Sequence, residues 1–199
     1  MKTLILGMGN TLLSDDGMGI ITKRYLEKRL DKCDTIDFCE TSWGGFRIID
    51  LLRGYDYAII VDSIKTKSKP AGYIHFLQPN DLLPTLRLTS YHDINFITAL
   101  KLAEQLGTKI PSDIEIYAIE IENNDTINEY INPSLWNSIV FCTDKILVSL
   151  QSKGIINEIR DDLVKTISLK TLRELYIEES DAEHSTYRNN TLKQEEYLV

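Results

Sequence analysis

The feature of this sequence that most constrains its fold is an uninterrupted apolar run over residues 57–61, which ends at Asp62. A strand without polar alternation is typical of the centre of a parallel sheet, where helices cover both faces. Residues 3–8 form a second run of this kind and stop at a glycine turn. The sequence therefore predicts a buried, largely parallel sheet.

Helical patterns alternate with the apolar runs. Strands are predicted at residues 3–8, 35–39, 57–61, 72–77 and 114–119, and helices at 17–30, 48–52, 93–106 and 132–150. We expect the strand at 72–77 to form a hairpin with the strand before it. Because strands alternate with helices, the expected fold class is α/β, a three-layer α/β/α arrangement with a mostly parallel central sheet and helices on both faces.

Bulk properties exclude several classes of partner. The formal net charge of -8 disfavours sequence-independent binding to nucleic acid and to an anionic membrane surface. No run of about 18 apolar residues occurs, so no membrane span is predicted. The three cysteines lack metal-type spacing and are expected to be free thiols in a reducing compartment, which indicates the cytoplasm.

The composition changes towards the C-terminus. Beyond Gly154 the chain becomes polar, although apolar residues keep helical spacing over residues 155–167 and 169–176. We expect residues 1–154 to form the α/β domain. Residues 155–199 are expected to form a C-terminal helical appendage with a partly disordered tail.

Candidate functional residues follow from the expected topology, because working groups in an open α/β sheet sit beyond the carboxyl ends of the strands. The first loop, GMGNTLLSDDGMG, contains Asp15 and Asp16, the third strand ends at Asp62, and the loop before the third long helix contains His92. Asp16, Asp62 and His92 would form a three-ligand site for zinc or nickel with a position left for substrate or water. Each also has a structural interpretation, as a helix cap or a turn residue.

Two other chemistries are disfavoured. The segment Gly7-x-Gly9 is similar to a dinucleotide-binding fingerprint, but Leu12 replaces the third glycine and the neighbouring aspartates would repel a phosphate. No G-x-S-x-G nucleophile motif occurs. Of the other histidines, His75 lies in a predicted strand and is expected to be structural, and His184 is expected to be solvated.

Several segments together resemble the hydrogenase maturation protease family. LILGMGNTLLSDDGMG resembles the opening signature of that family, an apolar strand followed by G-x-G-N and an acidic pair before glycine. YAIIVDSI resembles its strand ending in Asp, and TSYHDINFITAL its histidine ahead of a helix. KPAGYIHFL and IYAIEIENNDTINEYINPSLWNSI resemble later segments, so that the resemblance covers about residues 2–150. Ser63, where alanine is usual, and Trp43, where a small residue or threonine is usual, are departures.

The resemblance implies a function. It implies an endopeptidase that removes the C-terminal extension of a nickel–iron hydrogenase large-subunit precursor once nickel has been inserted. The implied partner is that precursor, which would carry the nickel itself, so that the isolated protein need hold no metal. The alternatives are a non-catalytic module that binds the nickel-loaded precursor, a nucleotide-binding α/β protein, and a relative of the germination-type proteases.

The resemblance also implies roles for individual residues. Asp16, Asp62 and His92 would contact the nickel and act in catalysis through it. Four further residues would shape the substrate cleft: Asn10, Glu40, Gly44 and Gly45. Whether the metal is catalytic or only recognised is left open, because a carboxylate such as Asp16 would also serve as a general base.

Overall fold

The computed structural model describes residues 1–30, 33–79, 96–128 and 130–157. Five strands form one sheet in the order β2-β1-β3-β5-β4. The strands are β1 (Thr3–Met8), β2 (Ile36–Thr41), β3 (Tyr57–Ile64), β4 (Ile74–Leu77) and β5 (Asp113–Glu120). β1, β2, β3 and β5 run parallel, and β4 is antiparallel to β5. The prediction of a mostly parallel sheet is confirmed.

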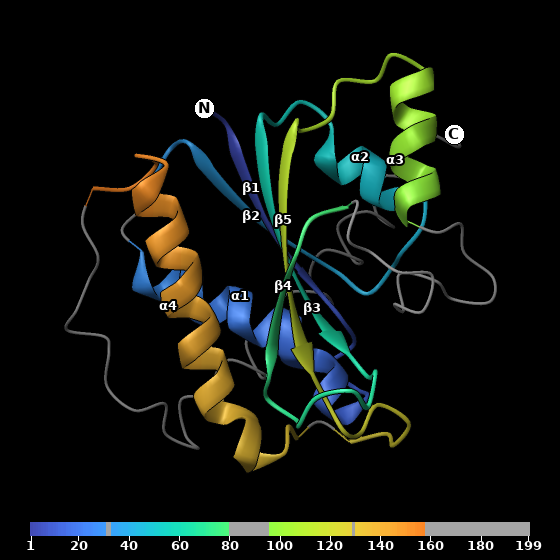
Figure 1. Ribbon diagram of the computed structural model, residues 1–199, viewed down its shortest axis with the longest axis vertical. Coiled ribbons are helices and arrows are strands. Elements are labelled where there is room, and N and C mark those ends of the chain that lie inside the picture. The colour runs from blue at the N-terminus through green and yellow to red at the C-terminus, as the bar shows by residue number, and fades with distance from the viewer. Residues whose placement is uncertain (31–32, 80–95, 129, 158–199) are drawn as a thin grey trace, which may run out of the picture. The chain divides into compact units, whose positions relative to one another are not determined.

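Helices cover both faces of this sheet (Figure 1). They are α1 (Met18–Arg29), α2 (Arg47–Leu52), α3 (Phe96–Gln105) and α4 (Trp136–Ser152), and the 3-10 turns η1 (Ser14–Gly17) and η3 (Pro133–Leu135) precede α1 and α4. α1 and α4 pack together on one face, and α2 and α3 contact each other on the opposite face. The three-layer α/β/α prediction is therefore confirmed.

The two central strands explain why the apolar runs in the sequence are continuous. Every residue of β1 is buried, and Asp62 is the one residue of β3 that is partly exposed. Alternate residues point to opposite faces of a strand, so both faces of β1 and β3 must be apolar. One core cluster joins side chains of this sheet to α2 and α3: Leu4, Leu6, Met8, Ile48, Leu52, Ala58, Ile60, Phe96, Ile114 and Ile116.

A glycine allows α1 to lie directly on the strands. A Cβ added to Gly19 would lie 2.3 Å from the carbonyl oxygen of Met8 and 2.4 Å from that of Val61. Only a residue without a side chain permits this contact, because neither backbone oxygen can move away cheaply. The close approach brings the first turn of α1 to the carboxyl ends of β1 and β3.

The structure corrects two details of the sequence prediction. The segment at 72–77 does not form a hairpin with the strand before it, because β4 pairs with β5 and β5 lies between β3 and β4. The third strand does not end at Asp62 but continues to Ile64, since Asp62, Ser63 and Ile64 all pair with β5.

Some predictions fall outside the described residues. They include His92, the beginning of the helix predicted at 93–106, and the appendage beyond residue 157. The chain divides into two units, residues 1–165 and 166–199, and the second lies wholly outside the described part. The predicted division at residue 154 stays a prediction. Within the described ranges, no helix has the length and apolar character needed to cross a membrane.

Candidate active site at the carboxyl edge of the sheet

Asp16 lies where the loop after β1 meets the start of α1. Its carboxylate accepts a hydrogen bond from the backbone N–H of Asn10 (3.0 Å) through Oδ2 and one from the hydroxyl of Ser63 (2.9 Å) through Oδ1. The N-cap position of α1 is Gly17, so Asp16 is not the residue that caps this helix. The structure thus places the carboxylate of Asp16 against the end of β3.

The loop can fold around Asp16 because residue 9 is glycine. Gly9 has a φ of 138°, in the region that residues with a side chain rarely adopt, and an added Cβ would lie 2.0 Å from the carbonyl oxygen of Asp16. This close approach, and not phosphate binding, accounts for the second glycine of the Gly7-x-Gly9 segment.

Asp62 lies next to Ser63 on β3 and is half-buried. Its Oδ1 accepts a hydrogen bond from the backbone N–H of Ser63 at 2.8 Å. Ser63 therefore contacts both candidate carboxylates, Asp62 through its nitrogen and Asp16 through its hydroxyl. Since these two atoms belong to one residue, the bonded oxygens of Asp16 and Asp62 lie within about 10 Å of each other.

The third predicted ligand, His92, lies outside the described residues. Within the described residues, no group of three or more His, Cys, Asp or Glu side chains is placed to hold a metal ion. Asp16 and Asp62 each contact Ser63, and the three-ligand site as a whole stays a prediction.

The predicted substrate-binding residues have different surroundings. Asn10 shapes the loop, since its side-chain oxygen accepts the N–H of Leu12 at 3.0 Å. Glu40 on β2 forms ion pairs with Lys23 (2.9 Å) and Arg24 (2.8 Å) of α1, so cations of the protein itself already face its carboxylate.

Gly44 and Gly45 lie in the segment between β2 and α2. Gly45 has a φ of 67°, whereas an added Cβ at Gly44 would meet nothing within 4 Å. The nearby Trp43 is 64% exposed. Contact with a substrate stays a prediction for these glycines, as it does for Asn10 and Glu40.

Comparison with known proteins gives this geometry a context. A family model described as "Hydrogenase maturation protease" matches residues 21–148, which is more than half of the chain. The chain belongs to the hydrogenase maturation protease family. As a member of this family it is a protease, a hydrolase of peptide bonds.

Two curated relatives are similar over most of their length. The chain is 25% identical over 166 residues to hydrogenase 2 maturation protease of Escherichia coli (strain K12), covering 78% of this chain and 94% of that protein. It is 22% identical over 163 residues to the hydrogenase expression/formation protein HupD of Thiocapsa roseopersicina, covering 81% of this chain and 73% of that one.

Solved structures of maturation proteases share the fold. The hydrogenase maturating endopeptidase HybD from E. coli matches with a TM-score of 0.66 at 22% identity, over 77% of this chain and 94% of that one. The [NiFe] hydrogenase maturation protease HycI from Thermococcus kodakarensis matches with a TM-score of 0.55 at 19% identity, over 75% of this chain and 92% of that one.

Within this maturation protease fold, the neighbour of Asp16 has a structural role that the sequence did not reveal. Asp15 is 1% exposed, and its carboxylate accepts the backbone N–H groups of Asn123 (3.2 Å) and Asn132 (2.8 Å). It therefore ties η1 to the loop that follows β5. The acidic pair of the family signature divides here into one buried and one half-buried carboxylate.

Glu120 is a second carboxylate that the sequence analysis missed. It is 1% exposed at the end of β5 and accepts hydrogen bonds from the N–H and hydroxyl of Thr66, the N–H of Lys67 and Nε2 of His75. Burial alone would raise the pKa of Glu120, but these hydrogen bonds outweigh it and hold the pKa below its ordinary value. The cluster fastens the segment after β3, and His75 has the structural role that the sequence indicated.

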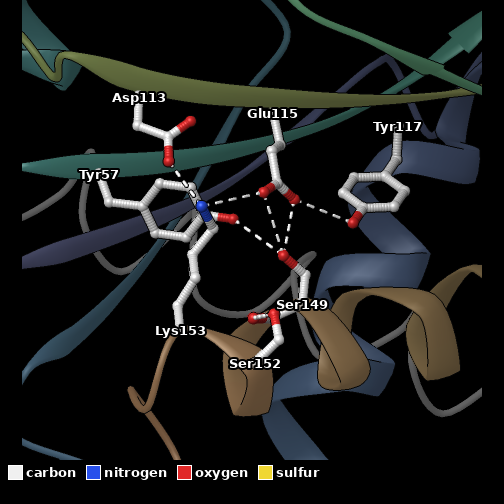
Figure 2. A network of polar contacts seen from close by, with 7 residues as sticks. All are labelled: Tyr57, Asp113, Glu115, Tyr117, Ser149, Ser152 and Lys153. Carbon is white, nitrogen blue, oxygen red and sulfur yellow. Dashed lines mark hydrogen bonds and ion pairs between the residues drawn. The ribbon is translucent and has the colours of Figure 1, made fainter.

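A polar network joins the first half of β5 to α4 (Figure 2). The carboxylate of Glu115 accepts hydrogen bonds from the hydroxyls of Tyr117 (3.0 Å) and Ser149 (2.8 Å), and Lys153 lies 3.4 Å away. Burial is the main cause that raises the pKa of Tyr117, with the charge of Glu115 adding to it. The network joins β5 to α4.

Proposed function

We propose that this protein is an endopeptidase that removes the C-terminal extension of a nickel–iron hydrogenase large-subunit precursor after nickel has been inserted. The observation that carries the proposal is the pair Asp16 and Asp62, joined through Ser63 at the carboxyl edge of a maturation protease sheet. Both relatives named above have a role in hydrogenase maturation or formation by their names, which supports the same class of substrate.

The chemistry of the residues fits a nickel-bearing substrate. Carboxylate oxygens and an imidazole nitrogen are suitable ligands for a divalent transition metal. Asp16, Asp62 and His92 would contact nickel already held by the precursor, so that metal insertion becomes the condition for cleavage. A metal ion beside the scissile carbonyl supplies polarisation of that carbonyl and a lower pKa for an attacking water.

The chain itself supplies orientation and a base. Two hydrogen bonds fix the Asp16 carboxylate in direction, from Asn10 on one side and Ser63 on the other. A carboxylate held in this way would accept the proton of the attacking water as it adds to the carbonyl. We place the reaction in the cytoplasm, because Cys33, Cys39 and Cys142 are all free thiols, as a reducing compartment would leave them.

The decisive experiment compares cleavage of a nickel-loaded and a nickel-free large-subunit precursor. Wild-type protein should shorten only the loaded precursor, and His92→Ala should reduce the rate by roughly 100-fold or more, because a metal contact is lost. His184→Ala is the matched control, since it removes a histidine outside the predicted site, and it should cleave at the wild-type rate.

Two results would count against the proposal. Tight binding of the loaded precursor without shortening would indicate a binding module in place of a protease. Equal cleavage of the loaded and the nickel-free precursor would show that the protein does not recognise nickel.

A further inference from the structure

We propose that the side chains of Leu12 and Ile127 form a docking surface for the large-subunit precursor, and that the segment of the precursor bound there is apolar and carries positive charge. These two side chains are called the aliphatic pair below. The inference rests on the proposed function for the identity of the partner, and it adds a surface that holds this partner beside Asp16.

The aliphatic pair comes from two loops at the same edge of the sheet. Leu12 follows β1 and Ile127 follows β5, and both strands run parallel to β3, so their carboxyl ends share one edge (Figure 1). Leu13 forms a parallel bridge with Asn128, and the N–H of Asn128 donates to the carbonyl oxygen of Leu12 at 3.0 Å. Leu12 and Ile127 are therefore neighbours in register, with their backbones about 5 Å apart and their side chains on the same side.

Both side chains of the pair are open to solvent. Ile127 is 84% exposed and Leu12 is 54% exposed, and Tyr130 in the same loop as Ile127 is also exposed. A single exposed aliphatic residue needs no explanation, whereas adjoining ones form an apolar surface that gains free energy when a partner covers it. The part of the partner that fits this surface is therefore apolar.

The surface is held in shape by contacts between the two loops. Ser14 has a φ of 54°, a left-handed backbone conformation that is uncommon for residues other than glycine. Its N–H donates to the carbonyl oxygen of Asn128 at 2.7 Å, and its hydroxyl donates to that of Tyr130 at 3.3 Å. The carboxylate of Asp15 adds two bonds to the same loop. A partner therefore meets a surface that is already ordered, which lowers the entropy cost of binding.

The aliphatic pair adjoins the candidate site. The side-chain oxygen of Asn10 accepts the N–H of Leu12 at 3.0 Å, and the N–H of Asn10 donates to the carboxylate of Asp16 at 3.0 Å. The backbone of Leu12 is thus linked to the Asp16 carboxylate through one residue. Because an extended chain rises about 3.3 Å per residue, a precursor with its scissile bond at Asp16 would reach the pair within a few residues.

The charges around the pair indicate the charge of the bound segment. By sequence, residues 121–131 contain three acidic residues and no lysine or arginine. Lys65 offsets part of this charge through its ion pair with Asp125 at 2.7 Å, and Glu122 is exposed. Since complementary charge guides association and selects partners, the apolar segment should be accompanied by Lys or Arg.

The test measures binding and cleavage of the nickel-loaded precursor by the full-length protein. Binding is measured by surface plasmon resonance in an Asp16→Asn background, so that the precursor is not consumed, and steady-state cleavage is measured with Asp16 intact. Ile127→Ser should weaken binding about 10-fold and raise KM by a similar factor, and Leu12→Ser should do so about 3-fold. The kcat should stay near its wild-type value, because a contact away from the reacting atoms acts equally on bound substrate and transition state.

Leu106→Ser is the matched control. Leu106 is a 70% exposed aliphatic residue that follows α3 and precedes β5, at the amino end of that strand. Its substitution should leave Kd and KM unchanged. All three variants should keep the wild-type melting temperature, because each changes an exposed side chain. Raising the salt concentration from about 50 mM to about 300 mM should weaken wild-type binding several-fold.

Three results would overturn the inference. The first is wild-type Kd and KM in a folded Ile127→Ser variant. The second is an affinity for the precursor that does not depend on salt, which would exclude a positively charged segment. The third is a wild-type dimer that becomes monomeric on Ile127→Ser in sedimentation experiments, which would assign the surface to a second copy of the chain.

The same assays separate this inference from the proposed function. If wild-type protein cleaves the loaded precursor and Ile127→Ser does so with unchanged KM, the docking surface fails while the protease assignment stands. If protein with Asp16 intact binds the precursor without shortening it, and Ile127→Ser still weakens that binding, the docking surface stands and the protease assignment fails.

Discussion

At the scale of single residues, two adjacent aspartates differ in what surrounds them. Asp15 is buried and accepts two backbone N–H groups from the loop after β5, whereas Asp16 is half-buried and faces Asn10 and Ser63. One carboxylate stabilises the fold of the loop, and the other belongs to the candidate site. This difference in role can be tested by substituting Asp15 and Asp16 separately and measuring stability and cleavage.

We expect Asp15→Ala to lower the free energy of unfolding by about 2 kcal/mol, because it leaves two backbone donors in a buried region without their acceptor. Asp16→Asn should instead reduce cleavage of the nickel-loaded precursor roughly 100-fold or more while changing the melting temperature little. Urea unfolding and single-turnover cleavage of both variants provide the check. If Asp15→Ala instead lost cleavage activity and Asp16→Asn lost stability, the structural and catalytic roles of the two residues would be exchanged.

Glu120 gives a prediction on acid stability. Its pKa is lower in the folded protein than the ordinary value of 4.5, so its contribution to stability is present above that value and is lost as pH falls through the lowered pKa. Glu120→Gln should therefore destabilise the protein by about 2 kcal/mol at neutral pH, and the difference from wild type should shrink in acid. Urea unfolding at about pH 7 and about pH 3 measures both differences. A difference independent of pH would contradict this account of Glu120.

The limits of sequence reasoning at this scale are visible in Asp15, Asp16 and Glu120. The position of Asp16 beyond a predicted strand was enough to bring it to the correct edge of the sheet. The burial of Asp15 was not predictable, because its donors at residues 123 and 132 lie more than a hundred positions away. Glu120 carried a weak signal, a carboxylate directly after the strand predicted at 114–119.

At the scale of elements, the contact of α1 with β1 and β3 depends on a residue without a side chain. The Gly19→Ala variant would bring a methyl group within 2.4 Å of two backbone oxygens, so α1 must shift away from the strands. We expect a loss of about 2 kcal/mol in the free energy of unfolding, together with lower cleavage activity, because the shift moves Asp16. Circular dichroism melts and the cleavage assay measure the two effects.

Gly44→Ala is the matched control for this prediction. An added Cβ at Gly44 has open space around it, and the change should alter the free energy of unfolding by less than about 0.5 kcal/mol. If Gly19→Ala and Gly44→Ala have the same free energy of unfolding, the close contact of α1 with β1 and β3 does not depend on a glycine at position 19.

Element types were predictable here, whereas one pairing was not. Continuous apolar runs identified β1 and β3, and helical spacing identified α1. β4 was assigned to a hairpin with the strand before it because nearby strands usually pair. Its actual partner, β5, comes 35 residues after the end of β4, and no local pattern in residues 72–77 specifies that distant strand.

At the scale of the whole molecule, the two ends of the sheet differ in their polar groups. Asp16, Asp62 and Ser63 gather at the carboxyl edge, and Glu115 with its hydroxyl donors lies towards the other end (Figure 2). Glu115 pairs with Ile59, which lies four positions before Ser63 on β3, a separation of about 13 Å along the strand.

This separation predicts that stability and activity can be changed independently. Glu115→Gln should lower the free energy of unfolding by about 1–2 kcal/mol, because it weakens hydrogen bonds to a charged acceptor in a buried network. Cleavage of the nickel-loaded precursor should keep its wild-type kcat/KM below the melting transition. A fall in kcat/KM with unchanged stability would show that the network communicates with the site.

The place of β3 in the strand order has a consequence for how the protein folds during its synthesis on the ribosome. β3 lies between β1 and β5, and β5 is translated only after 48 further residues have followed the end of β3. A nascent chain that already contains Asp16 and Asp62 still has a central strand with one bare edge, and non-local pairing of this kind forms slowly. The edge of the sheet that carries Asp16 and Asp62 is therefore completed only late in synthesis, after β5 has left the ribosome and paired with β3.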